Sequence, residues 1–430
     1  MLNSLKGDRT LIKQMNQRLV LQLIQGRGPI SRRDITKISG LSAASISGIT
    51  NSLMELGLIY EVGEADESGR AGRKAVLLRL NPQAGLVVGV KLARHSILAV
   101  LTDLDANVLH ETELLLPSDD PSAAPYNPDA TIQATIQTIT DLLAVSKIEP
   151  TRLLGIGIGT NGTVDAESGI SYMAPHFGWH NVSVTEPIST HFGIPVYLEN
   201  DSNTLTIAEQ WFGAGREATN FVAVAIGYGI GSGIVINKQL YRGASNGAGE
   251  FGHIILQKDG PLCSCGKHGC LEALASIPAI FRMLEESLRA GETSVLAGVK
   301  PLTIENVAHA AKKGDPLTLR ILDTAGRWLG LGIASFVNIL NPEIIVINGE
   351  AVILGSSYLG PMEAALREHV FDGLADSLRI ISESGGNEIW ARGAACVVLN
   401  SLFTFPGDQQ GVQFALPTEI YEPIKLKGVA

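Results

Sequence analysis

Several features that define other protein classes are scarce or missing in this sequence of 430 residues. Only four cysteines are present, too few for a disulfide scaffold. No apolar run reaches the length needed to cross a bilayer, because the longest, residues 221–236, is interrupted by residues that we interpret as a turn (Gly227, Tyr228, Gly229, Gly231 and Ser232). The N-terminus lacks the apolar core of a signal peptide. We therefore expect a cytoplasmic protein with no membrane partner.

The composition excludes intrinsic disorder, since hydrophobic residues make up 45% and charged residues 18% of the chain. The length predicts two or three domains. The net charge of −10 is unevenly spread: residues 1–80 contain 12 Lys+Arg and 7 Asp+Glu, a balance of +5, whereas the other 350 contain 21 and 36, a balance of −15. A basic head on an acidic body predicts that only the head binds a polyanion.

From residue 86 onward, short apolar runs alternate with helical patterns. A helix is predicted over residues 131–145, where one face is apolar, and the segment 117–128, with four prolines, is predicted to be a surface loop. This alternation predicts an α/β fold with a mixed, mostly buried sheet and helices on both faces. The predicted strands are residues 86–90, 97–101, 153–158, 196–198, 221–226, 234–236 and 344–347.

The first 80 residues have the pattern of a winged helix-turn-helix. A first helix is predicted over residues 11–23; Ser31 and Asp34 resemble a capping box at the start of a second, and Ser42 is placed to cap a third. Residues 58–62 and 75–80 are predicted to be strands joined by a basic loop, the wing. The side chains that we expect the second and third helices to bury are Ile35, Ile38, Ile46, Ile49 and Leu53.

The predicted third helix has small, neutral residues where a solvated helix face would have Lys and Glu, and such residues allow close approach to base edges. The residues expected to be exposed there are Ala43, Ala44, Ser45, Ser47, Gly48 and Thr50. DNA binding is therefore favoured over a helical hairpin used only for packing. The third helix has no Arg or Lys, so phosphate contacts are assigned to Arg32, Arg33, Lys37 and the wing residues Arg70, Arg73 and Lys74.

Three of the four cysteines, Cys263, Cys265 and Cys270, lie within eight residues, and His253 precedes the first by ten. Three thiolates and one imidazole make a closed tetrahedral zinc site of the structural type. Disulfides would conflict with a cytoplasmic chain, and inert buried thiols rarely gather this closely. The spacing leaves His268 as a competing fourth ligand. Cys396, in an apolar stretch, is interpreted as a core residue.

Polar residues that could bind a ligand follow predicted strands or the cysteine loop. Asn200 and Asp201 follow the strand at 196–198, and the carboxyl ends of strands are where α/β sheets bind ligands. Glu250 and His253 follow a glycine-rich stretch, and Glu272 follows the cysteines. Carboxylates, an amide and an imidazole suit a polyhydroxylated ligand. Each residue alone is more typical of a surface or a helix cap, so the prediction depends on the combination.

The segment from Gly252-His253 through Gly260 to the motif Cys-x-Cys-Gly-x-x-Gly-Cys-x-Glu, which ends at Glu272, resembles the signature of the ROK family. That family comprises sugar kinases and sugar-responsive repressors on an actin-like, two-lobed ATPase fold. The resemblance covers residues 84–402 and implies a winged helix-turn-helix domain followed by a ROK sugar-binding domain. The implied divisions are residues 1–80 for DNA binding, 84–402 for sugar binding (a first lobe of 84–200 plus a returning C-terminal helix, a second of 201–385), and a C-terminal extension at 406–430.

The head, with Gly40-Leu41-Ser42 and the run 69–73, is similar to the repressor branch, which includes xylose repressors. The resemblance implies repression of carbohydrate-utilisation genes, operator DNA and a sugar effector as partners, and a homodimer or homotetramer. The implied sugar contacts are Asn200, Asp201, Glu250, His253 and Glu272, and the implied zinc ligands are His253, Cys263, Cys265 and Cys270.

The sequence departs from the kinase branch where that branch has an acidic residue and a Gly-Gly-Thr turn around the ATP phosphates. Here Lys91 and the turn Ala93-Arg94-His95 stand in their place, although the glycines of a second phosphate loop at 227–233 remain. Lysine cannot bind magnesium, and only glycine lets the backbone approach phosphates this closely. We therefore expect no enzymatic activity. The alternatives are a sugar kinase with a DNA-binding head, in which Asp201 acts as general base, and a regulator controlled mainly by a protein partner.

Overall fold

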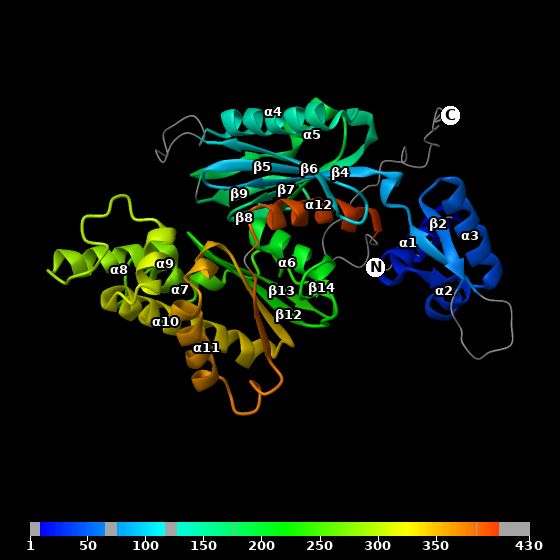
Figure 1. The fold of residues 1–430 in the computed structure, drawn as a ribbon. Coiled ribbons are helices and arrows are strands. Elements are labelled where there is room, and N and C mark those ends of the chain that lie inside the picture. Colours follow the sequence, from blue (N-terminus) through cyan, green and yellow to red (C-terminus); the bar gives the residue numbers. More distant parts are fainter. Residues whose placement is uncertain (1–8, 65–74, 117–126, 176, 384, 404–430) are drawn as a thin grey trace, which may run out of the picture.

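The computed structural model describes residues 9–64, 75–116, 127–175, 177–383 and 385–403. Within these ranges the chain forms a small N-terminal head and a larger body of two lobes (Figure 1). Arg70, Arg73 and Lys74 of the predicted wing, most of the predicted loop at 117–128 and the C-terminal extension at 406–430 lie outside the described residues. In the described part of the chain, no helix is both long and apolar enough to cross a membrane.

The head has the three helices and the strand pair that the sequence predicts. The helices are α1 (Arg9–Arg27), α2 (Arg32–Ser39) and α3 (Ala43–Glu55), and the sheet has the order β1 (Ile30–Ser31), β3 (Val76–Leu80), β2 (Ile59–Glu64). The predicted caps are confirmed, because the side chain of Ser31 accepts a hydrogen bond from the Asp34 amide and that of Ser42 accepts one from the Ser45 amide. These caps fix where α2 and α3 begin.

The core of the head is close to the predicted one, with two differences. Ile35, Ile46, Ile49 and Leu53 are buried, but Ile38 is 42% exposed. The expectation that Ile38 is buried is wrong, because Ile35 is the only buried residue of the eight-residue helix α2. Thr50, expected on the exposed face of α3, is fully buried, and its hydroxyl accepts a hydrogen bond from Arg32 Nε at 3.0 Å.

The first lobe contains a five-stranded sheet in which three antiparallel strands are extended by two parallel ones. Its order is β11 (Val196–Asn200), β7 (Leu153–Thr160), β4 (Leu86–Leu92), β5 (Ser96–Thr102), β6 (Val108–Leu115). Two helices pack with its core, α4 (Pro128–Ser146) and α5 (Thr185–Phe192). A small antiparallel sheet follows β7, in the order β10 (Trp179–Ser183), β9 (Ile170–Ala174), β8 (Thr163–Asp165).

The second lobe repeats the strand order of the first. Its sheet runs β14 (Gln239–Leu240), β13 (Ile230–Ile236), β12 (Phe221–Ile226), β15 (Ile344–Asn348), β16 (Arg379–Ser382), again with three antiparallel strands followed by two parallel ones. The duplicated order confirms the expected α/β fold of two lobes. The remaining helices of this lobe are α7 (Leu271–Ala275), α8 (Ile277–Arg289), α9 (Ile304–Lys312), α10 (Pro316–Leu340) and α11 (Ser356–His369).

Two helices lie between the sheets, α6 (Asp201–Trp211) and α12 (Glu388–Phe403) (Figure 1). Helix α12 packs against the first sheet so closely that a Cβ at Gly89 would collide with the Ala391 carbonyl. It packs equally closely against α6, because a Cβ at Gly393 would collide with the Thr204 carbonyl. The last described helix is therefore a central element of the body.

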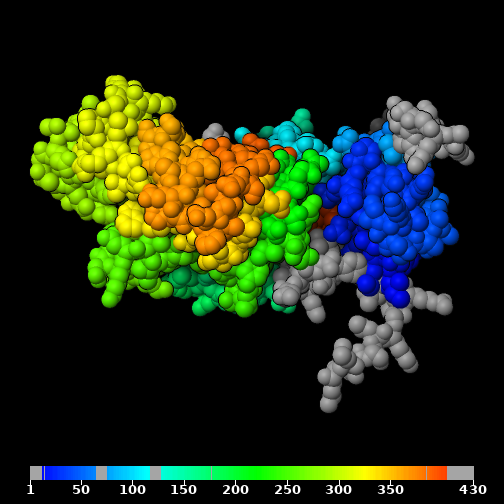
Figure 2. Space-filling model, turned by 90° about the horizontal axis from the view of Figure 1, so that it is seen from below, coloured from blue at the N-terminus to red at the C-terminus, as the bar shows by residue number. Residues whose placement is uncertain are grey.

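The head is joined to the body by a shared hydrophobic cluster. Ile24 of α1 and Leu80 of β3 belong to the same buried cluster as Tyr197 of β11, Ile207 of α6 and Val398 of α12. Cys396 is fully buried in this cluster, which confirms its interpretation as a core residue. Figure 2 shows the head lying directly against the body. A movement of α6 or α12 would therefore act on the head through packed side chains.

Candidate functional site

The three clustered cysteines and His253 come together at the edge of the second lobe. All four ligand atoms lie within 4.8 Å of one another, with 3.6 Å between the sulfurs of Cys265 and Cys270 and 3.7 Å between Cys263 Sγ and His253 Nδ1. Ligands around a tetrahedral zinc ion are about 3.5–3.8 Å apart, given the usual Zn–S and Zn–N bond lengths. The two printed ligand distances match that spacing, so the cluster is consistent with a tetrahedral metal ion.

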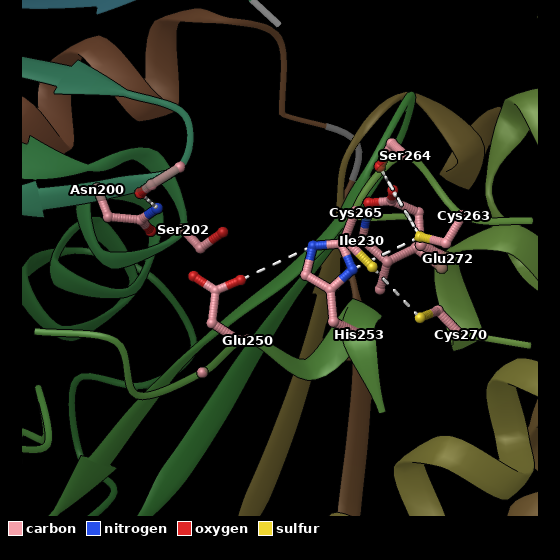
Figure 3. Close-up of polar contacts among 12 residues, drawn as sticks. Asn200, Ser202, Ile230, Glu250, His253, Cys263, Ser264, Cys265, Cys270 and Glu272 are labelled. Atoms are coloured by element: carbon pink, nitrogen blue, oxygen red, sulfur yellow. Dashed lines mark hydrogen bonds and ion pairs between the residues drawn. The ribbon is translucent and has the colours of Figure 1, made fainter. Parts of the chain in front are cut away.

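The structure favours His253 over His268 as the fourth ligand. The Nδ1 atom of His268 faces the carbonyl of Gly260 at 3.0 Å, and His268 is not part of the cluster. His253 presents Nδ1 to the cysteines, while its Nε2 faces Glu250 Oε2 at 3.9 Å (Figure 3). That distance is within ion-pair range but too long for a hydrogen bond, so Glu250 lies beside the ring without a hydrogen bond to it. His253 thus links the cysteine cluster to Glu250.

Glu272 is tied to the same loop by hydrogen bonds. Its Oε1 accepts a hydrogen bond from the Ser264 hydroxyl at 2.8 Å and lies 3.7 Å from Cys263 Sγ, and its Oε2 accepts one from the Ile230 amide at 3.2 Å. Glu272 stands in the first turn of α7, two residues after Cys270. The cysteine loop therefore positions Glu272 as well as His253.

Asn200 and Asp201 lie where β11 ends and α6 begins, as predicted. The Asn200 side chain caps α6 by accepting from the Asn203 amide, and it donates to the Gly162 carbonyl at 2.8 Å. Glu250 lies between this corner of the first lobe and His253 of the second (Figure 3). Burial raises the pKa of Glu250, and His253 opposes that rise. The predicted ligand-binding residues thus approach one another from both lobes.

A buried salt bridge that we did not predict joins the lobes beside this site. Glu199 Oε2 of β11 accepts hydrogen bonds from Arg242 Nη2 at 2.7 Å and Nε at 3.0 Å, and the two side chains are 1% and 15% exposed. Glu199 Oε1 accepts from the Asn200 amide and from Asn203 Nδ2. Arg242 follows β14 of the second lobe. The carboxylate of Glu199 therefore binds the second lobe through one oxygen and the backbone amide of Asn200 through the other.

Lys91 stands where the kinase branch has its acidic residue, and its ammonium group contacts other side chains of the protein. Lys91 Nζ donates to Asn387 Oδ1 at 2.8 Å and lies 3.9 Å from the centre of the Trp390 ring. Burial lowers the pKa of Lys91, whereas Glu350 and Asp201 raise it. In the second phosphate loop, the Gly227 amide donates to the Gly229 carbonyl, and the Glu350 carboxylate lies against Gly227. A carboxylate there repels the phosphates that a kinase must hold.

The recognition face of α3 is exposed as predicted at Ala43, Ala44, Ser45, Ser47 and Gly48, with Thr50 as the exception noted above. Arg33 and Lys37 on α2 are also exposed. Arg32 is different, because Nη1 forms a salt bridge with Glu61 at 3.0 Å and Nε binds Thr50. Arg32 therefore links α2 to α3 and to β2 within the head.

Comparison with known proteins shows the family to which this chain belongs. The sequence model of the ROK family matches residues 87–401. The chain belongs to the ROK family. The xylose repressor of Bacillus subtilis (strain 168) is 30% identical over 394 residues, which are 92% of this chain and 97% of that protein. The DNA-binding transcriptional dual regulator NagC of Escherichia coli (strain K12) is 31% identical over 375 residues, which are 87% and 90% of the two chains.

Solved structures separate the two branches of the ROK family. A ROK family transcriptional regulator, a homologue of the E. coli MLC protein, has a TM-score of 0.79 at 32% identity and covers 91% of this chain and 97% of its own. A ROK glucokinase from Streptomyces griseus, solved with glucose and AMPPNP, has a TM-score of 0.62 at 26% identity and covers 73% of this chain and 99% of its own. Since the regulators match the head as well as the body, this ROK protein is a transcriptional regulator and not a kinase.

Proposed function

We propose that this protein is a sugar-responsive repressor of carbohydrate-utilisation genes, acting in the cytoplasm, that a sugar releases from its operator. The observation that carries the proposal is the hydrophobic cluster shared by the head and the body, which includes Leu80 of β3 and Ile207 of α6. Asp201, the first residue of α6, lies at the proposed sugar site, and α6 then runs to the head. A lobe movement caused by sugar would change where the head is held.

The head would bind the operator through α3, with base contacts from Ala43, Ala44, Ser45 and Ser47. Phosphate contacts would come from Arg33 and from the wing residues Arg70, Arg73 and Lys74. Arg32 would also contact phosphate, but that contact competes with Thr50 and Glu61, which already bind its guanidinium. One recognition helix covers only a half-site, so we propose a homodimer or homotetramer.

The sugar would lie between the lobes and be held by Asn200, Asp201, Glu250, His253 and Glu272. Carboxylate and amide oxygens are the acceptors that sugar hydroxyls need, and these residues come from both lobes. A ligand that bridges them would favour a closed arrangement of the lobes, because it binds that arrangement better. The relatives named for xylose and N-acetylglucosamine support a sugar effector.

We further propose that the metal in the cluster is zinc, one ion per chain, bound by His253, Cys263, Cys265 and Cys270. Four protein ligands leave no open position, so the zinc would be structural. Support comes from the ligand distances and from the absence of a hydrogen bond that would hold His253 elsewhere in the described part of the chain. Bound zinc would hold the loop that positions Glu272.

The experiment that tests the function measures operator affinity with and without sugar. A thermal-shift screen of common sugars first identifies the effector, because a ligand stabilises the state that it binds. In the wild type, the effector should weaken operator binding roughly 5- to 150-fold, which corresponds to a coupling free energy of about 1–3 kcal/mol. Asp201→Ala should bind the operator normally and no longer release it.

The matched control is Glu217→Ala, at an exposed carboxylate just beyond α6, which should respond like the wild type. If Asp201→Ala still responds at the wild-type sugar concentration, Asp201 is not part of the effector site. If no sugar binds and a protein partner changes operator affinity instead, the proposed signal is wrong.

A further inference from the structure

A polar cavity lies between the head and the body, away from the proposed sugar site. Its volume is about 250 Å³. The end of α1 and strand β3 of the head form one side, and the loop after β5, the end of α6 and the start of α12 form the other. Trp211, the last residue of α6, lines this cavity, whereas Asp201, the first, belongs to the proposed sugar site. At 1.5 Å per residue the two sites are about 15 Å apart along one helix.

Three arginines line this cavity, one from each of three parts of the molecule. Arg79 comes from β3 of the head, Arg216 from the segment after α6, and Arg392 from α12. Asp105 is the single acidic residue in the lining. With three arginines and one aspartate, the lining is opposite in charge to residues 81–430, which contain 21 Lys+Arg and 36 Asp+Glu, and the nearby carboxylates of Asp103 and Glu388 offset part of this charge at Arg392. Such a local reversal concentrates anions.

These arginines have hydrogen-bond donors that no described residue uses. Arg392 donates from Nε to the Ala106 carbonyl at 2.5 Å, and its guanidinium carbon lies 3.5 Å from the centre of the Phe212 ring. This contact holds the guanidinium in place while its terminal nitrogens have no hydrogen-bond partner among the described residues. Arg79 lies 3.7 Å from Asp105 Oδ2, beyond hydrogen-bond range, and Arg216 has no ion pair with any described residue.

We propose that this cavity binds a phosphate group, either as inorganic phosphate or on a small phosphate ester. Guanidinium groups match phosphate oxygens in pairs, and three of them facing one cavity supply more donors than Asp105 can use. The volume suits a small metabolite, not a polymer. A bound phosphate would connect β3 of the head to α12 and to the end of α6, and so would hold the head in one position on the body.

The test is calorimetry on the full-length protein without DNA, in a phosphate-free buffer of low ionic strength. Inorganic phosphate or glycerol 3-phosphate should bind saturably at one site per chain, and glycerol should not bind. Arg79→Ala and Arg216→Ala should each weaken binding by about tenfold or more, since each removes a charged partner. Both side chains are exposed, so neither change should alter thermal unfolding. The matched control is Arg289→Ala, an exposed arginine on α8, which should bind phosphate normally.

Tighter binding of the ester identifies an ester as the ligand, and equal binding identifies free phosphate; either result supports the site. The proposal is overturned if no probe binds saturably, or if the Arg79→Ala/Arg216→Ala double variant binds as the wild type does. It is also overturned if no probe binds and the variants weaken operator binding, because the arginines would then contact DNA. Since phosphate binding is measured without DNA, its failure leaves the repressor proposal intact. Holding the head in one position would affect operator binding only if the protein is the DNA-binding repressor that we propose, so that consequence alone rests on the proposed function.

Discussion

The salt bridge between Glu199 and Arg242 allows a prediction whose magnitude can be worked from the structure. Arg242→Met keeps most of the side-chain length but removes the cation, which leaves a carboxylate that is 1% exposed without its two hydrogen bonds to Arg242. Removing one partner of a buried pair costs about 3–5 kcal/mol. The Asn200 amide and Asn203 Nδ2 still donate to Glu199 Oε1, so we expect a loss of about 3 kcal/mol in unfolding free energy.

The assay is urea unfolding of the wild type, Arg242→Met, Glu199→Gln and the double variant. The double variant should be more stable than Arg242→Met alone, because it no longer buries an unpaired charge. The matched control is Arg289→Met, which breaks a surface pair with Glu285 in which the arginine side chain is 72% exposed. That change should cost within about 0.5 kcal/mol. A loss for Arg242→Met no larger than the control's would show that the bridge does not hold the lobes together.

The remaining predictions concern the metal, the lost kinase chemistry and pH. Metal analysis should find about one zinc per chain in the wild type. The zinc should be lost in Cys265→Ser but retained in Cys396→Ser, because Cys396 lies in the core and not in the cluster. Full zinc in Cys265→Ser would contradict the assignment. A coupled assay should detect no ATP-dependent sugar phosphorylation by the wild type or by Lys91→Asp, because Glu350 still lies against the phosphate loop in that variant. Turnover by the wild type that disappears in Asp201→Asn would restore the kinase hypothesis. Burial raises the pKa of Glu209 to about 7 from an ordinary 4.5. Between these two pH values the folded protein keeps a proton on Glu209 that the unfolded chain has lost. The free energy of unfolding should therefore fall as the pH rises from 4.5 to about 7. Glu209→Gln should flatten that dependence in urea midpoints measured across the window, and an unchanged slope would show that another group causes it.

The features that could be predicted from the sequence depend on residues close together in the chain. The caps at Ser31 and Ser42 each bind an amide three residues ahead, so the sequence motif contains the whole interaction. The cysteine loop is similar, since its sulfur ligands lie within eight residues. The buried strands were recognisable because burial on both faces favours a near-continuous apolar run, as at residues 86–90 of β4 and 97–101 of β5.

The features that were missed depend on contacts between distant segments. Arg242 and Glu199 are 43 residues apart, and nothing near either one indicates the other. Thr50 is buried, and its hydroxyl accepts a hydrogen bond from Arg32, which lies 18 residues earlier. Strand β6 was missed because most of its side chains are exposed and many are polar, so it has no apolar run.

The start of strand β13 shows that glycine can occur either in a turn or inside a strand that another element approaches closely. The sequence interpretation assigns Gly231 and Ser232 to a turn and begins the strand only at residue 234. The interpretation is wrong, because the strand begins at Ile230, and the turn is confined to the residues before it. Gly231 and Gly233 are small because Ser202 and Thr206 of α6 press against them. Glycine there allows a helix to approach a strand and does not mark a change of direction.

The central position of α12 has a consequence for how the protein is made. Gly89 and Gly157, near the beginning of the body, pack against Ala391 and Ala394, which the ribosome adds near the end. Until those residues leave the ribosome, the face of the first sheet that they cover stays exposed, and so does the surface on which the head packs. The first lobe therefore cannot finish folding in the order in which it is translated. A premature stop before α12 would remove the final packing partner of head and body together and would leave the apolar surface that α12 covers open to aggregation.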